Sequence, residues 1–87
     1  MTCKLTILNR NGLHARPASV LVRAASEFAS DIYVTKNENT IDAKSIIGVI
    51  TLAVAYGEKI TVKAIGRDAK QAIRRIKRLA ESKFNER

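Results

Sequence analysis

Apolar residues recur in this chain with two different periods, and the order of these periods constrains the fold more than any other feature of the sequence. Alternation at every second residue, the pattern of a half-buried strand, occupies four segments: 2–7, 32–35, 40–43 and 60–64. Recurrence at every third and fourth residue, the pattern of an amphipathic helix, occupies two segments: 16–29 and 69–80. Polar and glycine-containing turns separate these segments, so we expect short strands and helices that follow one another in mixed order.

A third helix is predicted from an apolar run that periodicity alone does not assign. Residues 46–54 read Ile-Ile-Gly-Val-Ile-Thr-Leu-Ala-Val, which fits either a buried strand or a short buried helix. The length of the run and the serine at its head, Ser45, favour a helix with Ser45 as its N-cap. Pro17 stands where only the first turn of a helix tolerates it, and Asp68 with Gln71 has the spacing of a capping box for the last helix.

The predicted element order is therefore βαββαβα, and 87 residues allow one small domain that spans residues 1–87. A chain of this length has no room for a dinucleotide-binding fold or a catalytic barrel. The order suits the α+β class, with an antiparallel sheet that carries its helices on one face. The pattern does not determine the strand order, and a ferredoxin-like βαββαβ arrangement stays open at this point.

Basic residues outnumber acidic residues by 16 to 8, which gives a formal net charge of +8. This excess predicts anionic partners: a phosphate, a nucleic acid, a membrane or an acidic protein surface. Four basic residues crowd the outward side of the last predicted helix: Arg74, Arg75, Lys77 and Arg78. A nucleic-acid-binding module is therefore the competing functional class. Because two Tyr, two Phe and no Trp are available for base stacking, a nucleic-acid partner is not expected.

The chain has a single cysteine, Cys3, and a single histidine, His14. One cysteine excludes an internal disulfide, and this pair is no ligand set for a metal ion, so we predict neither a metal nor a bound cofactor. The first residues alternate in polarity instead of forming an apolar run, and no segment reaches the length of a membrane span. We therefore expect a cytoplasmic protein without membrane insertion.

His14 is the candidate functional residue, because it lies in the segment that joins the first strand to the first helix. Unpaired N–H groups and the macrodipole make a helix start a natural site for a phosphate. The positive helix end and Arg16 both disfavour imidazolium, so we predict a neutral, nucleophilic ring. Gly12 permits a positive φ and a close backbone approach, and Pro17 fixes the direction of the free amides. The competing interpretation of a lone loop histidine is a surface residue without a role.

Residues 11–18 around His14 and residues 44–49 around Ser45 form two motifs. Together they resemble the HPr family, the histidine-containing phosphocarriers of the bacterial sugar phosphotransferase system. Residues 11–18, Asn-Gly-Leu-His-Ala-Arg-Pro-Ala, look like the active-site signature of that family. Residues 44–49, Lys-Ser-Ile-Ile-Gly-Val, followed by Leu52 and Ala53, look like its second signature. Length and element order also match, so the resemblance extends over essentially the whole chain.

The resemblance implies the chemistry of the site. HPr proteins accept a phosphoryl group from enzyme I, which phosphoenolpyruvate charges, and pass it to the IIA domains of sugar permeases. By motif match, His14 is the phosphorylated residue and Arg16 its anion partner, and four residues position the phosphate: Gly12, Ala15, Arg16 and Pro17. The implied fold is an HPr-like open-faced β-sandwich, a four-stranded antiparallel sheet with three helices on one face. We expect a monomeric carrier that is not an enzyme by itself.

The resemblance also implies regulation at Ser45, because HPr kinase/phosphorylase phosphorylates the matching serine in HPr proteins of the Gram-positive type. One or two isoleucines of the short helix are expected to be exposed and to dock enzyme I or a transcriptional regulator: Ile46, Ile47 and Ile50. Arg23 is expected in a basic rim around His14 that attracts acidic partners. A nitrogen-type or regulatory phosphorelay protein is the alternative within the family. The retained histidine and the intact Ser45 segment favour the sugar-transport type.

Overall fold

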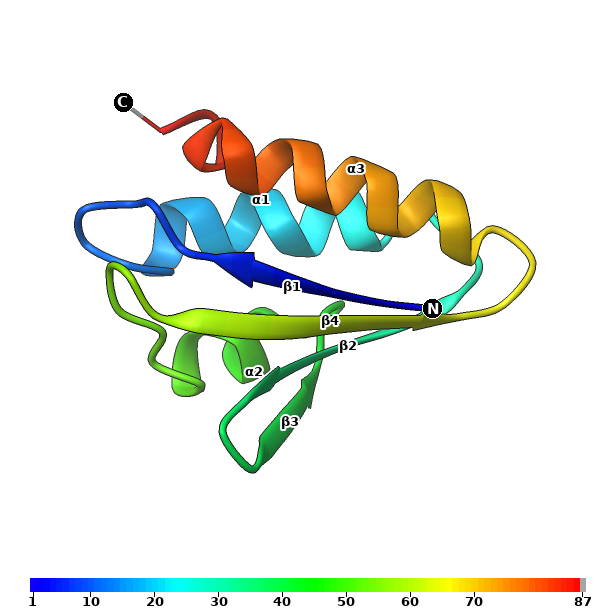
Figure 1. Ribbon diagram of the computed structural model, residues 1–87, viewed down its shortest axis with the longest axis horizontal. Coiled ribbons are helices and arrows are strands. Elements are labelled where there is room, and N and C mark those ends of the chain that lie inside the picture. Colours follow the sequence, from blue (N-terminus) through cyan, green and yellow to red (C-terminus); the bar gives the residue numbers. More distant parts are fainter. Residues whose placement is uncertain (87) are drawn as a thin grey trace.

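The computed structural model describes residues 1–86; Arg87, which the predicted domain includes, lies outside the described residues. The elements follow one another as β1 (Thr2–Thr6), α1 (Ala15–Ala25), β2 (Asp31–Lys36), β3 (Asn39–Asp42), α2 (Ile46–Thr51), β4 (Lys59–Ile65), α3 (Ala69–Glu81) and a 3-10 turn, η1 (Lys83–Asn85) (Figure 1). This succession confirms the predicted order βαββαβα. It also confirms that the apolar run after Ser45 begins as a helix.

The four strands form one sheet in the order β1-β4-β2-β3, and every neighbouring pair is antiparallel. In this register Leu5 of β1 lies opposite Ile60 of β4, and Val62 of β4 lies opposite Val34 of β2. In the ferredoxin-like alternative each βαβ unit places one strand between the two strands of the other unit, so the first strand is internal; here β1 lies at the edge of the sheet, and this strand order excludes that alternative. The predicted α+β class and open-faced antiparallel sheet are confirmed.

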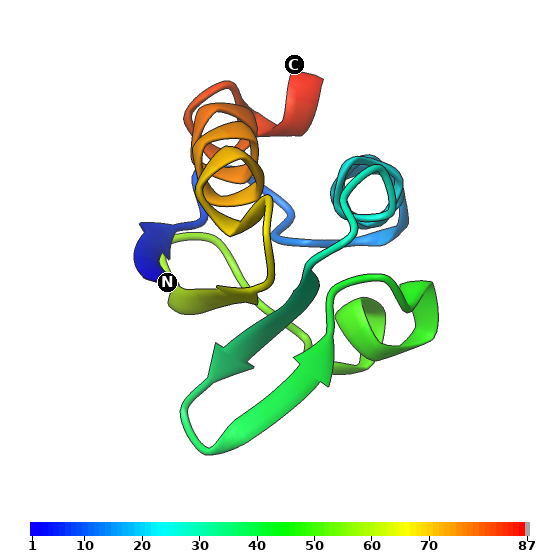
Figure 2. The ribbon, with the colours of Figure 1, turned by 90° about the vertical axis from the view of Figure 1, so that its right-hand side faces the viewer.

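The helices cover one face of the sheet and leave the other open. Seen end-on, α1 and α3 lie side by side above the strands, and α2 lies beside them over the β2–β3 side (Figure 2). On β4, Ile60, Val62 and Ala64 are buried while Lys59 and Lys63 are exposed, as the alternation of a half-buried strand requires. The buried face meets the apolar stripes of the long helices, including Leu21 and Ile76. Burial of this interface provides the main stabilisation of the domain.

The first helix ends four residues earlier than its apolar spacing predicts. The prediction extended it to Ala29, whereas α1 ends at Ala25 with Ser26 as C-cap. The Ser26 hydroxyl donates to the carbonyl of Val22 at 2.7 Å, and the chain then turns toward β2. Phe28 lies in this turn and still packs against the core. Its apolar side chain therefore fits the helical spacing, although the backbone is no longer helical at that position.

The predicted capping box at the start of α3 is wrong. Asp68 is the N-cap residue, but its side chain makes no capping hydrogen bond. Its carboxylate instead accepts from the backbone N–H groups of Ala29 at 2.8 Å and Ser30 at 2.9 Å, and from the Ser30 hydroxyl. Asp68 therefore ties the start of α3 to the turn between α1 and β2, across 38 residues of sequence.

Candidate functional site

His14 is the N-cap residue of α1. Its backbone is extended, with φ −76° and ψ −172°, and its carbonyl accepts from the Ala18 N–H at 2.9 Å to close the first helical turn. Because Pro17 has no N–H, the free amides at this helix end belong to Ala15 and Arg16. The imidazole makes no capping bond and is 39% exposed, so an incoming group can reach it beside these amides.

A carboxylate from the far end of the sequence lies against the imidazole. Glu86 Oε2 is 2.6 Å from His14 Nε2, and Glu86 Oε1 accepts from the Asn9 side-chain amide at 2.7 Å. The same Asn9 nitrogen also donates to the Lys83 carbonyl at 2.7 Å. The prediction of a neutral ring considered only the helix end and Arg16, and it therefore left out the charged group closest to the ring.

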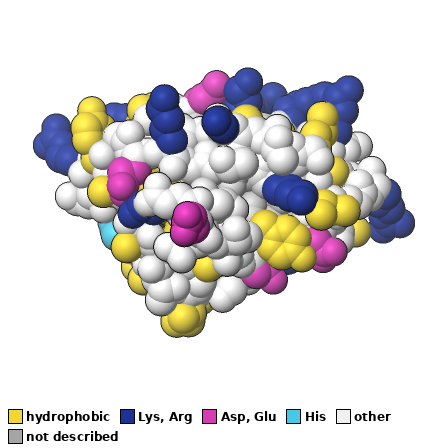
Figure 3. All heavy atoms as spheres, turned by 60° about the horizontal axis from the view of Figure 1, so that its bottom comes forward, with side chains coloured by type: hydrophobic (Ala, Val, Ile, Leu, Met, Phe, Trp, Pro, Cys, Tyr) yellow, Lys and Arg dark blue, Asp and Glu magenta, His cyan; other side chains and the backbone are white. Residues whose placement is uncertain are grey.

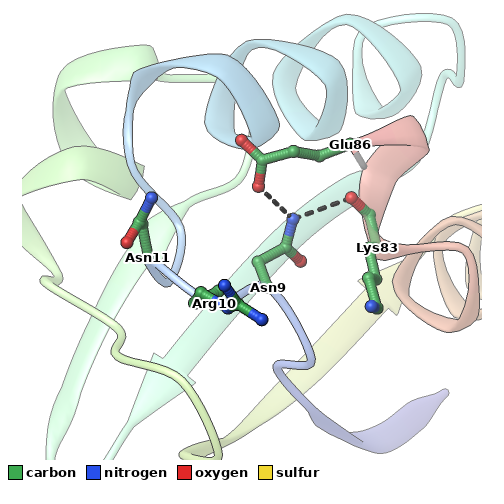
Figure 4. A pocket seen from close by; sticks show the side chains of 5 residues that line it. All are labelled: Asn9, Arg10, Asn11, Lys83 and Glu86. Carbon is green, nitrogen blue, oxygen red and sulfur yellow. Dashed lines mark hydrogen bonds between the residues drawn. The ribbon is translucent and has the colours of Figure 1, made fainter.

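Asn9 forms part of the wall of a pocket beside the ring. Asn9, Arg10, Asn11, Lys83 and Glu86 line this pocket of about 380 Å³ (Figure 4). The Asn9 amide points toward the Glu86 carboxylate and the Lys83 carbonyl, while Arg10 and Asn11 come from the loop after β1 (Figure 4). Two segments far apart in the sequence thus meet at the start of α1.

The electrostatics of the site favour an ionised Glu86. The hydrogen bond from Asn9 and, after it, the contact with His14 hold the pKa of the Glu86 carboxyl below its usual value. The positive charge of Arg16 lowers the pKa of Glu86 in the same direction. The Arg16 residue is exposed, and its guanidinium stays available to an anion at the helix end.

Gly12 has the left-handed backbone that the sequence analysis expects, with φ +70°. A Cβ on Gly12 would lie 2.1 Å from the carbonyl oxygen of Val54. The next residue, Leu13, is buried and donates its N–H to the same carbonyl at 2.9 Å. Gly12 therefore packs closely against the segment that precedes β4, and this contact fixes the loop that carries His14.

Ser45 is the N-cap of α2, as predicted. Its hydroxyl accepts from the Gly48 N–H at 3.1 Å. The three isoleucines of α2 divide as expected: Ile46 is half-buried against the core, whereas Ile47 is 68% and Ile50 is 40% exposed. Figure 3 shows hydrophobic side chains beside the single histidine at the edge of this face. The two exposed isoleucines, three positions apart on α2, thus add apolar area to the surface of a molecule with a net charge of +8.

Arg23 does not lie at the ring. It is exposed in the last turn of α1, nine positions after His14, and at about 1.5 Å per residue this is about 13 Å along the helix axis. The predicted basic rim around His14 therefore consists of nearer residues, Arg10 and Arg16, and Arg23 belongs to a more distant part of the surface.

Within residues 1–86, no three or more His, Cys, Asp and Glu side chains gather as a metal site would require. Among the helices described, none combines the length and the apolar character needed to cross a bilayer.

Sequence reasoning missed Asn9 and Glu86. Asn9 follows the alternating residues of β1 as an ordinary turn residue, and Glu86 lies 72 positions after His14. Neither has a periodic or spacing signal that connects it with the histidine. Only the return of α3 along α1 brings the three side chains together (Figure 1).

Comparison with known proteins supports the family resemblance that the two motifs suggest. The family model described as PTS HPr component phosphorylation site matches residues 1–82. The chain is 49% identical to a phosphocarrier protein HPr of Mycoplasma capricolum over 82% of this chain and 80% of the relative. It is 41% identical to the phosphocarrier protein HPr of Treponema pallidum, over 92% and 91% of the two chains.

A solved structure agrees with these relatives. The crystal structure of HPr-C-His from Thermoanaerobacter tengcongensis superposes with a TM-score of 0.96 at 41% identity and covers 100% of this chain and 98% of the other. The matched family model, the identity and the shared fold together establish the relationship. The chain belongs to the HPr family, the phosphocarriers of the phosphotransferase system, which carry a phosphoryl group and are not catalysts by themselves.

Proposed function

We propose that His14 accepts a phosphoryl group from phosphorylated enzyme I and passes it to the IIA domains of sugar permeases. The observation that carries this proposal is the position of an accessible imidazole at the N-cap of α1, beside the free amides of Ala15 and Arg16. Such a helix end stabilises a phosphate through its N–H groups and its dipole. Phosphoryl transfer depends mainly on positioning and charge stabilisation, so a small exposed site is sufficient.

The contact with Glu86 selects the ring nitrogen that reacts. With the proton on Nε2 shared with Glu86, the lone pair of the neutral ring is on Nδ1. The Nδ1 lone pair forms the new N–P bond while the bond between phosphorus and the donor atom of enzyme I breaks, and the electron pair of that bond returns to the donor. Arg16 and the free amides hold the transferred phosphoryl oxygens. Gly12 and Pro17 hold the loop and the helix start that aim them.

Mass measurement after incubation with enzyme I and phosphoenolpyruvate tests this function. We expect the gain of one acid-labile phosphate, located on His14. The variant His14→Ala should gain none, because it lacks the nucleophile. Ser45→Ala is the matched control: it removes the other proposed phosphorylation site and should keep the acid-labile phosphate. An acid-stable phosphate, or an unchanged mass for the parent chain, would contradict the proposal.

We further propose that HPr kinase/phosphorylase phosphorylates Ser45 and thereby slows transfer to His14 by weakening partner docking. A phosphate at the N-cap is compatible with α2, because the helix dipole favours an anion there. It would add negative charge beside the exposed Ile47 and Ile50, and so repel an acidic partner. A single phosphate thus changes the surface while the fold stays intact.

Ser45→Asp separates docking from chemistry. We expect weaker affinity for enzyme I with an unchanged single-turnover rate at saturating enzyme I. Ser45→Ala is the uncharged control for loss of the cap. Unchanged affinity combined with slower single-turnover transfer would defeat the docking explanation.

The remaining partner proposals follow from the surface. We propose that Ile46, Ile47 and Ile50 form the centre of the docking surface for enzyme I and for a transcriptional regulator, with Arg23 on its outer border. The chain would form one HPr-like domain over residues 1–87 and act as a monomeric carrier in the cytoplasm. Measurement of its molar mass in solution, at the protein concentration used in the transfer assays, tests whether it is a monomer.

Membership of the HPr family favours a phosphoryl carrier and not a nucleic-acid-binding module, which was the competing functional class. Within the family we propose the sugar-transport type over a nitrogen-type or regulatory relay, because His14 and the Ser45 segment are both present. Transfer from the phosphorylated chain to a sugar-specific IIA domain, compared with a nitrogen-type IIA domain, distinguishes them. Faster transfer to the nitrogen-type domain would overturn this assignment.

A further inference from the structure

We propose that Asn9 and Glu86 are positioning residues for phosphoryl transfer: Asn9 fixes the Glu86 carboxylate, and the carboxylate fixes the orientation and the proton position of the His14 ring. The inference rests on the proposed role of His14 and extends it to two residues outside both sequence motifs. One carboxylate bridges two side chains, with Oε1 on Asn9 at 2.7 Å and Oε2 on His14 Nε2 at 2.6 Å.

The Asn9 amide has a single orientation. It is 1% exposed, and its Nδ2 donates to two acceptors, the Lys83 carbonyl and the Glu86 carboxylate. A rotation by a half turn would place Oδ1 against both acceptors, so the donor must face them. The other end of the amide, Oδ1, is buried and has no hydrogen-bond partner among the residues that the structure describes. Asn9 thus gives up one buried hydrogen bond while holding Glu86.

The segment that carries Glu86 has an unfavourable backbone. Lys83, Phe84 and Asn85 all have left-handed φ angles, 55°, 51° and 62°. Residues with a Cβ adopt this region singly and rarely in succession, so surrounding contacts must hold the turn. Phe84 is 1% exposed and provides the apolar anchor, and Asn9 provides the polar one through the Lys83 carbonyl. Asn9 therefore fixes both the backbone and the side chain that place Glu86 at the ring.

This arrangement matches the charge that develops during transfer. When Nδ1 of His14 bonds to phosphorus, the ring keeps its proton on Nε2 and becomes positively charged. The Glu86 carboxylate faces that proton, and a carboxylate in this position orients the ring and stabilises the imidazolium. Without Asn9, the carboxylate can rotate away, and the neutral ring can then place its proton on either nitrogen.

The tautomer of the ring is the direct readout, and it needs no phosphoryl donor. Since the chain has one histidine, ¹⁵N labelling gives a single pair of ring signals. We would record them at about pH 9, well above the ordinary histidine pKa of about 6.5. The parent chain should hold its proton on Nε2, and Asn9→Ala should show both tautomers. In Glu86→Gln the new carbonyl accepts from Asn9 and the new NH₂ faces Nε2, so the proton should move to Nδ1.

Transfer kinetics complete the test. We expect acceptance of the phosphoryl group from phosphorylated enzyme I to be about tenfold slower in Asn9→Ala and in Glu86→Gln. Glu58→Gln is the matched control, because the Glu58 carboxylate likewise has two partners, the Ala55 N–H at 2.7 Å and the Lys36 ammonium at 2.9 Å, and neither of them is the His14 ring. It should change neither readout. Glu86→Gln, near the surface, keeps the test valid if Asn9→Ala does not fold.

Equal tautomer ratios in the parent chain, Asn9→Ala and Glu86→Gln would overturn the positioning role, even if His14 of the parent chain is phosphorylated and the proposed function stands. Absence of phosphate on the parent chain would overturn the proposed function, and the positioning role with it. Shifted tautomers together with slower transfer, and an unaltered Glu58→Gln control, would support both.

Discussion

At the residue scale, two glycines with left-handed backbone angles differ in what surrounds them. Gly12 (φ +70°) packs against the Val54 carbonyl, whereas at Gly57 (φ +81°) only the adjoining residues of the chain come within 4 Å of the place where a Cβ would lie. Both positions disfavour a side chain for conformational reasons. Only at Gly12 does the fold also leave no space for it, and only Gly12 lies in the loop that carries His14.

Gly12→Ala is therefore expected to lower the free energy of unfolding by about 3 kcal/mol or more, since steric overlap adds to the backbone penalty. Gly57→Ala, as the matched control, should cost only about 1–2 kcal/mol, the backbone penalty alone. Urea unfolding followed by circular dichroism measures both. Equal losses in the two variants would show that the contact with Val54 contributes nothing.

At the element scale, the joint between α1, β2 and α3 depends on one carboxylate. Hydrogen bonds from the Ser30 hydroxyl and, after it, the Ala29 N–H lower the pKa of Asp68 from its usual 3.8 to about 2. Ser30 is buried, so its hydroxyl and N–H depend on this partner. Hydrogen bonds to the Asp68 carboxylate thus attach the start of α3 to the turn between α1 and β2, and no capping box is formed.

The lowered pKa makes the stability of this joint pH-dependent. Because the folded-state pKa lies below the unfolded one, the carboxylate stabilises the fold fully above about pH 4, and this contribution is lost as the pH falls from 3.8 to about 2. Asp68→Asn should flatten the acid side of the stability curve, measured by urea unfolding between these pH values. Asp31→Asn is the matched control, because it removes one negative charge, as Asp68→Asn does. An identical acid slope in the two variants would contradict the role of the Ser30 contact.

At the scale of the whole molecule, the surface combines a large excess of positive charge with a small exposed apolar area on α2. The net charge is +8, and the outward side of α3 exposes Arg74, Arg75, Lys77 and Arg78. The exposed apolar side chains of Ile47 and Ile50 can interact with a partner only at contact, because they carry no charge. Charge acts at long range, so it is expected to set how quickly an acidic partner arrives.

The association rate constant with phosphorylated enzyme I should fall about tenfold or more as the salt concentration rises from about 50 to about 500 mM. Stopped-flow mixing measures this slope. Arg10 lies in the loop before His14, whereas Lys70 lies in the first turn of α3. Arg10→Gln should therefore reduce the salt dependence of the rate constant more than Lys70→Gln, although each variant removes one positive charge. A rate constant independent of salt would exclude electrostatic steering.

Several features could be predicted because neighbouring residues produce them. Ser45 caps α2 through a bond to Gly48, three positions away, and the order of strands and helices follows from apolar periods within each segment. The same local reasoning failed where a side chain had a distant partner. Asp68 has the spacing of a capping box with Gln71, yet the folded chain offers it Ser30, 38 positions away, and that contact prevails.

The sequence by itself determined the element order, the one-sided distribution of apolar residues and the placement of a histidine at a helix start. These depend on periodicity and on backbone groups within one turn, which any fold of this chain would retain. The tertiary structure alone decided the strand order and the contact of Asn9 and Glu86 with His14. Contacts across 72 and 77 residues arise from the way α3 returns along α1, and no local pattern encodes that path.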